Sequence, residues 1–132
     1  MNEPLFLTLD EVLRFHVDQI EQFGGDNAIL DIGKLESAIA QPQMTWHGKY
    51  LHADLAAMAA AYLFHIVQNH AFADGNKRTG MNAAIVFLEL NGYGLDWPED
   101  NTEQMVLSVA NGEMKQEDVA AFVRKLIEEQ HS

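Results

Sequence analysis

Residues 70–80 read His-Ala-Phe-Ala-Asp-Gly-Asn-Lys-Arg-Thr-Gly and separate two strongly apolar segments, 55–67 and 81–90. This short run holds a histidine, a carboxylate, an Asp-Gly turn signal, an asparagine and two adjacent cations. Turn residues between two apolar segments mark a connection between elements. The density of polar groups at this connection, where a new helix is expected to begin, predicts a functional site rather than a plain linker.

The two cations, Lys77 and Arg78, fall in the first turn of the expected second helix. A helix N-terminus is already partly positive, so each cation there is unfavourable by about 0.3–1 kcal/mol without a counter-charge. A bound anion would remove this conflict, and the free N–H groups of a first helical turn bind phosphate. Gly75 lets the backbone approach a ligand closely. Although adjacent cations are more often a solvated surface, this position favours a phosphate site, with Asn76 expected as the N-cap.

Each residue of the run also has a simpler explanation when it is taken alone. His70 is a favoured cation at a helix C-terminus, Asp74 and Gly75 make an ordinary turn, and Asn76 is an ordinary cap. The occurrence of all these residues together favours a catalytic site. Imidazole exchanges protons near neutral pH, so His70 is the candidate base, and Asp74 is the candidate oxygen ligand for Mg²⁺. Phe72 is expected to anchor the loop in the core.

The overall charge argues against nucleic acid as a direct ligand. Eight Lys and Arg residues face twenty Asp and Glu residues, which gives a formal net charge of −12 and a pI near 4.6. Proteins that draw their affinity from phosphate backbones need the opposite sign. The sequence predicts a local cationic site on an acidic protein.

Length and composition favour one soluble domain over residues 1–132. The chain has no cysteine, which excludes disulfides and thiolate metal sites and suits a reducing cytoplasm. No basic stretch followed by an apolar one opens the chain, so a secretory signal is not expected. The apolar run 55–67 contains His65 and is shorter than the ~20 residues that span a bilayer, so a membrane location is not expected either.

Apolar residues recur at helical spacing through most of the chain, and no strand of convincing length is present. Thr8 and Glu11 make a capping box ahead of the first helix, Asp31 and Asp54 are expected as caps of the second and third, and His16 is expected to be a packed, hydrogen-bonded core residue. The sequence therefore predicts a single compact all-α domain with two central helices joined by the loop. The expected helices cover residues 9–23, 31–39, 55–69, 76–91, 102–110 and 119–127.

The stretch 43–52 loses helical periodicity and has β-favouring residues around Gly48. A small hairpin or an irregular flap is expected there. His47 and His52 are too far apart for one helical face, and the chain has no His-Glu-x-x-His pattern, so ordinary loop histidines are favoured over a zinc site.

The run 70–80 resembles the signature of the Fic/Doc proteins, His-x-Phe-x-(Asp/Glu)-Gly-Asn-(Gly/Lys)-Arg. The similarity is greatest to the death-on-curing (Doc) branch and extends to Gly24-Gly25, Leu35-Glu36-Ser37-Ala38, Pro42, the Ala-rich helix before the loop, and Asn91-Gly92. Every specified position of the signature is matched, by His70, Phe72, Asp74, Gly75, Asn76, Lys77 and Arg78.

The resemblance implies an all-helical fold with the loop at the junction of two central helices, and ATP with Mg²⁺ as cosubstrate. It also implies that His70 deprotonates a hydroxyl of a target protein, that Asp74 holds Mg²⁺, and that Asn76, Arg78 and the helix-start amides, with Gly75 and Lys77 among them, bind phosphates. The segment that would match the family's target-docking flap consists of Thr45, Trp46, His47, Gly48, Lys49 and Tyr50.

Two departures from the broader Fic pattern bear on the reaction. Most Fic adenylyltransferases have glycine at the position of Lys77 and a second arginine at the position of Met81. Both residues resemble Doc toxins, which place the nucleotide in the opposite sense and transfer its γ-phosphate. The resemblance therefore favours a protein kinase acting on a translation factor, elongation factor Tu by analogy. The alternatives are an adenylyltransferase of the same fold and a catalytically silent module that only binds an antitoxin or another peptide.

The resemblance also implies how such a toxin is controlled. The inhibitory Fic signature Ser/Thr-x-x-x-Glu-(Gly/Asn) is not found in the chain, so a separate antitoxin is expected. Doc antitoxins supply a disordered segment that folds as a helix into a groove of the toxin.

Overall fold

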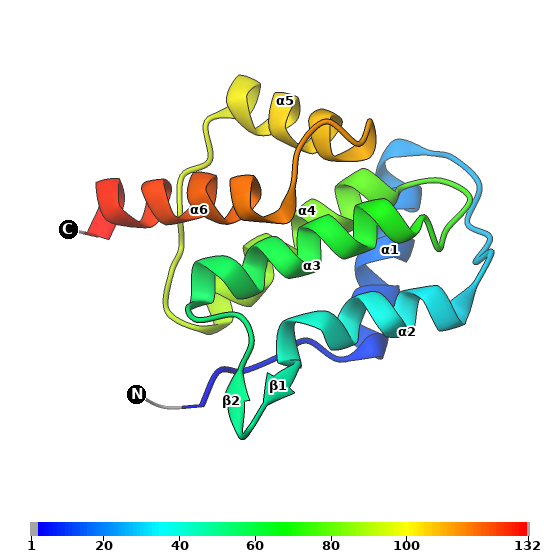
Figure 1. Ribbon diagram of the computed structural model, residues 1–132. Coiled ribbons are helices and arrows are strands. Elements are labelled where there is room, and N and C mark those ends of the chain that lie inside the picture. The colour runs from blue at the N-terminus through cyan, green and yellow to red at the C-terminus, as the bar shows by residue number, and fades with distance from the viewer. Residues whose placement is uncertain (1–2, 132) are drawn as a thin grey trace.

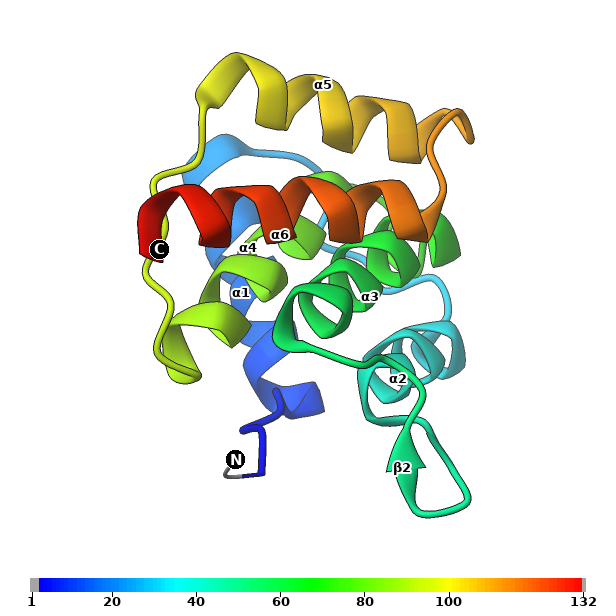
Figure 2. The same cartoon turned by 60° about the vertical axis from the view of Figure 1, so that its left-hand side comes forward.

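The computed structural model describes residues 3–131. Helix α3 (Leu55–Asn69) lies at its centre and is buried on nearly every side, as its apolar sequence predicts. Figure 2 shows α5 and α6 on one side of α3, with α2 and the hairpin on the other. In order, the elements are α1 (Leu9–Phe23), α2 (Ile32–Ala40), the 3₁₀ turn η1 (Gln41–Gln43), β1 (Thr45–Trp46), β2 (Lys49–Tyr50), α3, α4 (Asn76–Leu90), α5 (Glu99–Ala110) and α6 (Gln116–His131) (Figure 1).

The predicted caps of the first three long helices are confirmed. Thr8 accepts from the Glu11 N–H while the Glu11 side chain accepts from the Thr8 N–H, which completes the capping box of α1. Asp31 and Asp54 cap α2 and α3 by accepting N–H groups of their first turns. These local patterns need no tertiary contact, and for this reason they can be found from sequence.

Helix α5 begins three residues earlier than predicted, at Glu99 instead of Thr102. Pro98 occupies the N-cap position in an extended conformation, and its carbonyl accepts the Thr102 N–H. The acidic residues of the added turn, Glu99 and Asp100, are stabilised by the helix dipole. Apolar periodicity alone misses this turn because it buries little.

Helices α3 and α4 pack closely at Gly80. A Cβ atom at this position would lie 2.8 Å from Val67 Cγ2 and 3.2 Å from the Leu63 carbonyl oxygen. Gly80 itself is buried inside α4. The absence of a side chain therefore sets the separation of the two helices that carry the loop 70–75.

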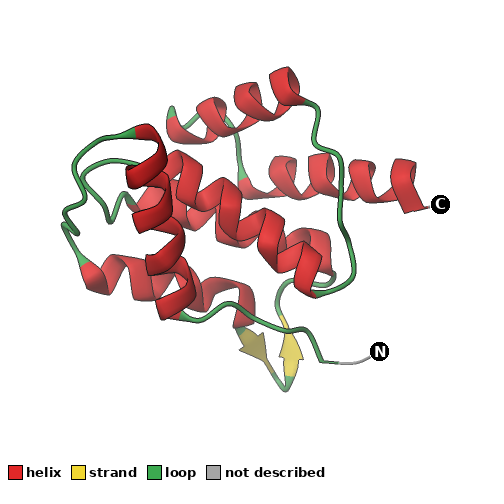
Figure 3. Ribbon diagram, turned by 180° about the vertical axis from the view of Figure 1, so that it is seen from behind, coloured by secondary structure: helices red, strands yellow, loops and turns green. Residues whose placement is uncertain are grey.

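The expected hairpin is present and short. Thr45 pairs with Tyr50 and Trp46 with Lys49 in antiparallel register. The turn residues His47 and Gly48 both have positive φ, 51° and 76°, which suits the tight turns that favour hairpins. Figure 3 shows the strands beside the N-terminal segment, away from the loops that join α1 to α2 and α3 to α4.

No helix in residues 3–131 is both long enough and apolar enough to cross a membrane.

Adding a methyl group at Gly80 tests the close packing of α3 and α4. We expect Gly80→Ala to lower the free energy of unfolding by about 1–2 kcal/mol, because overpacking costs about 1–3 kcal/mol and better helix propensity offsets up to about 1. Gly94→Ala is the matched control, since nothing lies within 4 Å of its added Cβ. Urea unfolding of both variants measures the difference, and equal stability would contradict this account of Gly80.

Candidate active site

The loop 70–75 is entered and left through residues in the left-handed region. His70 ends α3 with φ 49° and ψ 51°, and Gly75 precedes α4 with φ 83° and ψ 12°. Gly75, not Asn76, is therefore the N-cap of α4, and no side chain caps this helix. The expectation that Asn76 is the N-cap is wrong by one residue. The first-turn N–H groups of α4 are left without a side-chain acceptor, which is the arrangement that binds anions.

Asn76 instead holds the loop together from inside. Its side chain is buried, its Oδ1 accepts the Phe72 N–H at 3.1 Å, and its Nδ2 donates to the Phe72 carbonyl at 2.9 Å. The same Nδ2 lies 3.3 Å from His70 Nδ1. When this contact is a hydrogen bond from the amide, neutral His70 carries its own proton on Nε2. The Asn76 amide thus joins the loop backbone to the candidate base.

Phe72 lies fully buried and stacks on His16, with the ring centroids 3.6 Å apart and the planes 7° from parallel. His16 Nε2 lies 2.8 Å from the Asp74 carbonyl oxygen and donates to it. The prediction that His16 is a packed, hydrogen-bonded histidine is confirmed. Through these two contacts of His16, α1 supports the loop at both Phe72 and Asp74. The sequence alone did not reveal this support.

Asp74 is held by a segment more than forty residues earlier in the chain. Its Oδ2 accepts the Asp26 N–H at 2.7 Å, and among residues 3–131 its Oδ1 has no hydrogen-bond partner. Gly25 makes this approach possible, since a Cβ there would lie 3.1 Å from Asp74 Cβ and 3.3 Å from Oδ2. The sequence signal was the Gly24-Gly25 pair, whose resemblance to the Doc branch does not by itself predict a contact with Asp74.

The two cations at the start of α4 are exposed, and neither forms a salt bridge within the described part of the chain. The Arg78 guanidinium carbon lies 3.8 Å from the centroid of the Phe23 ring, a cation–π contact with the last residue of α1. Sequence reasoning missed Phe23. The charge conflict expected at this helix start is therefore present, and only an aromatic face moderates it.

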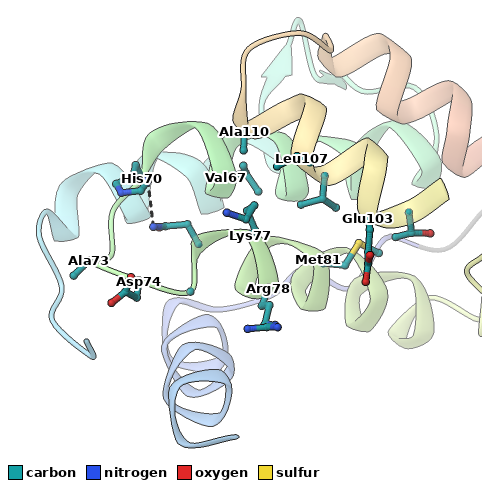
Figure 4. A pocket seen from close by; sticks show the side chains of 14 residues that line it. Val67, His70, Ala73, Asp74, Lys77, Arg78, Met81, Glu103, Leu107 and Ala110 are labelled. Carbon is teal, nitrogen blue, oxygen red and sulfur yellow. Dashed lines mark hydrogen bonds between the residues drawn. The ribbon is translucent and has the colours of Figure 1, made fainter. Parts of the chain in front are cut away.

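A cavity of about 720 Å³ opens between this loop, the start of α4 and one face of α5. Figure 4 shows His70 and Asp74 at one end of the cavity and Glu103 and Met81 at the other, with Lys77 between them. The structure thus gathers in one cavity six residues of the loop and helix start that sequence singled out: His70, Asp74, Gly75, Asn76, Lys77 and Arg78.

A single carboxylate fits the way in which Mg²⁺ is bound beside phosphates. The ion prefers one or two carboxylates together with phosphate oxygens and water, and Asp74 offers a free Oδ1 in the same cavity as Lys77. Within residues 3–131 no group of three or more histidine, aspartate or glutamate side chains is arranged for a metal ion. The donor set suits a metal that arrives with a polyphosphate.

The hairpin 45–50 does not line the cavity. It precedes the N-terminal end of α3, whereas His70 lies at the other end of this 15-residue helix, which is about 22 Å away at 1.5 Å per residue. Among the predicted target-docking residues, Trp46 has 68% of its surface exposed. Their docking role stays a prediction.

Just beyond the hairpin, a chain of hydrogen bonds joins His52 to α6 and α3. His65 Nε2 lies 3.0 Å from Gln116 Oε1, and Gln116 Nε2 lies 3.3 Å from His52 Nδ1. Burial lowers the pKa of both His52 and His65. Burial therefore disfavours the charged form of both rings, and their hydrogen bonds to Gln116 tie the base of the hairpin to the helical core.

Lowering the pH should reduce the stability that the neutral forms of His52 and His65 give to the fold. The unfolded chain takes up protons as the pH falls through about 6.5, whereas the folded chain resists, because the pKa of each ring is lowered in the fold. These histidines therefore reduce stability progressively below that pH. We expect a smaller loss of unfolding free energy between about pH 7.5 and 5.5 in His65→Gln than in the wild type.

Denaturant unfolding at both pH values measures this difference. His131→Gln, at an exposed position near the C-terminus, is the control and should keep the wild-type pH dependence. Identical pH dependence in the wild type and His65→Gln would contradict the assignment.

Comparison with known proteins identifies the family of this chain. The family model described as the Fic/DOC family matches residues 6–88. A protein named Toxin Doc from Mycolicibacterium smegmatis is 40% identical over 101 residues, which cover 75% of this chain and 78% of that protein. A protein named Protein kinase doc from Escherichia phage P1 is 32% identical over 118 residues, which cover 89% and 91% respectively. The chain belongs to the Fic/DOC family and is similar to its Doc members.

Proposed function

We propose that this protein is a Doc-type toxin that transfers the γ-phosphate of ATP to a Ser or Thr hydroxyl of a translation factor, elongation factor Tu by analogy, and so inhibits translation. The observation that carries the proposal is the single cavity that brings together His70, Asp74 and the uncompensated cation Lys77. The printed names of the two relatives, a toxin and a protein kinase, support the same class.

His70 accepts the proton of the target hydroxyl in this proposal. With the proton of the resting ring on Nε2, the free lone pair is on Nδ1, which faces the Asn76 amide at 3.3 Å. That separation is long for a hydrogen bond, so a substrate hydroxyl can replace the contact at little cost. The hydroxyl oxygen then bonds to the γ-phosphorus, and the bond from the γ-phosphorus to the bridging oxygen breaks, releasing ADP.

The remaining groups act by position and charge. Lys77, Arg78 and the free N–H groups after Gly75 hold phosphate oxygens, and Asn76 keeps the loop in shape. Asp74 would hold Mg²⁺, and the ion would supply positive charge that offsets the phosphates. Stabilisation of this kind accounts for most of the catalysis in phosphoryl transfer.

Lys77 and Met81 support phosphate transfer over AMP transfer. Lys77 lines the middle of the cavity, where its side chain takes up space beside the helix start. Met81, one turn further along α4, also lines the cavity and offers no charge for a terminal phosphate. Adenylylation by the same fold is the alternative reaction, and it would break the bond between the α- and β-phosphates.

Control by a separate antitoxin completes the proposal. The partner supplies a disordered segment that folds as a helix into a groove of this protein, a binding mode that is easily reversed because ordering the segment costs affinity. A catalytically silent module that only binds such a peptide is the alternative from another class. The chain retains His70, Asp74 and Arg78 together, which a module without chemistry does not require.

Labelled ATP separates these functions. We expect a bacterial extract incubated with the protein and γ-labelled ATP to show a labelled protein that is missing with His70→Ala, because removal of a general base costs about 10²–10⁴ in rate. With α-labelled ATP, no His70-dependent label is expected. Gel autoradiography measures both.

Label from the α position would replace the kinase with an adenylyltransferase. A lack of any His70-dependent label would favour the binding module. The His70→Ala control must first show a wild-type unfolding curve.

A pair of glycine variants tests the role of Asp74. Gly24 and Gly25 both have positive φ, 81° and 114°, so alanine strains the backbone at either position by about 1–3 kcal/mol. Only the Cβ at position 25 would press on Asp74, while nothing lies within 4 Å of the one at position 24. We expect Gly25→Ala alone to raise the Mg²⁺ concentration needed for half-maximal label transfer, about tenfold for a loss of 1.4 kcal/mol. An equal Mg²⁺ requirement in the two variants would argue against Asp74 as the metal ligand.

A further inference from the structure

The cavity continues beyond the signature loop, and its far part is built by a helix that the signature does not include. Five residues of α5, at positions 102, 103, 106, 107 and 110, line it and follow helical spacing, so one face of α5 forms a wall. Val67 and Met81 line the cavity from α3 and α4. We call the part between Met81 and the α5 face the α4–α5 slot.

The slot differs chemically from the loop end of the cavity. Its lining is apolar at Met81, Val106 and Leu107, and its one charged side chain beyond Lys77 is the carboxylate of Glu103. Figure 4 places Glu103 beside Met81, at the end away from His70. A phosphate is repelled by such a surface, because it meets the like charge of Glu103. A flat ring with apolar faces and an N–H donor at its edge fits it.

The nucleotide that the proposed function requires has two chemically different halves. Its phosphates match the loop end, where Lys77, Arg78 and the helix-start N–H groups lie. About 720 Å³ is within the range of ligand cavities, which hold a small molecule in an apolar lining with a few polar groups. The remaining space beside the phosphates is the slot.

Resting on the proposed function, we infer that the α4–α5 slot binds the nucleoside half of an amino-bearing purine nucleotide. The base packs between Met81 and Leu107, and Glu103 accepts a hydrogen bond from its amino group. Lys77 marks the border between the nucleoside and the phosphates. Specificity for the base therefore resides in α5, a helix outside the residues 6–88 that the family model matches.

Comparing ATP with inorganic tripolyphosphate tests the slot separately from the phosphate site. Calorimetric titration of the whole protein, in Mg²⁺, measures both affinities. We expect Leu107→Ser to weaken ATP about fivefold to tenfold, since part of a leucine's burial is lost, and to leave tripolyphosphate unchanged. Leu90→Ser is the matched control and should alter neither, because Leu90 is similarly exposed, 43% against 46% for Leu107, and lies outside the cavity.

The role of Glu103 is tested by comparing the affinities for two nucleotides that differ only in the amino group of the base. We expect the wild type to prefer ATP over purine riboside triphosphate, which lacks the amino group, and Glu103→Ala to lose this preference. Glu99→Ala, also exposed on α5 but outside the cavity, should keep it. Retention of the preference in Glu103→Ala would overturn the assignment of this residue.

The outcomes distinguish the slot from the function on which it rests. If ATP and tripolyphosphate bind equally well, or Leu107→Ser leaves ATP affinity unchanged, the slot does not hold the nucleoside, while the phosphate site remains. If neither probe binds the wild type, both the nucleotide-dependent function and the slot are wrong. Unfolding curves of every variant exclude loss of fold as the cause.

Discussion

The close packing of α3 against α4 at Gly80 is the constraint on which the site depends. The loop 70–75 is only six residues long, and it must return the chain from the end of one buried helix to the start of another. Val67 and the Leu63 carbonyl of α3 lie close to Gly80 of α4. This close packing fixes the position at which α4 can begin relative to the end of α3. The backbone then reverses through left-handed conformations at His70 and Gly75. The separation of the candidate base His70 from the uncapped first-turn N–H groups of α4 follows from this packing.

The loop itself is held by polar groups that also appear in the functional signature. Asn76 provides both hydrogen bonds to the Phe72 backbone and the contact to His70, so one amide both shapes the loop and orients the candidate base. From outside, α1 contributes the stack of His16 on Phe72, and the segment after it binds Asp74. A residue matched to a family motif, here Asn76, can therefore have mainly structural contacts.

The local charge at the start of α4 is opposite in sign to the net charge of the protein. A chain with a net charge of −12 has two cations at the start of α4, where the helix dipole opposes them, and neither forms a salt bridge within residues 3–131. Phe23 contacts Arg78, and Glu103 closes the other end of the cavity with the opposite charge. This separation of charge is the basis for proposing phosphates at one end of the cavity and an uncharged ring at the other. The local charges in the cavity thus differ from the net charge of the chain.

The sequence by itself determined the helical class, the caps at Thr8, Asp31 and Asp54, and the hairpin, and it singled out the loop as a candidate site. Each of these depends on neighbours a few residues apart, through the hydrogen-bonding preference of a side chain or the periodicity of one helical face. Only the tertiary structure decided the rest. It moved the N-cap of α4 to Gly75, placed Gly25, Phe23 and His16 around the loop, set α5 as a cavity wall, and left the hairpin at the far end of α3. These contacts join residues tens of positions apart, and side-chain pattern along one segment carries no information about which other segment will pack against it.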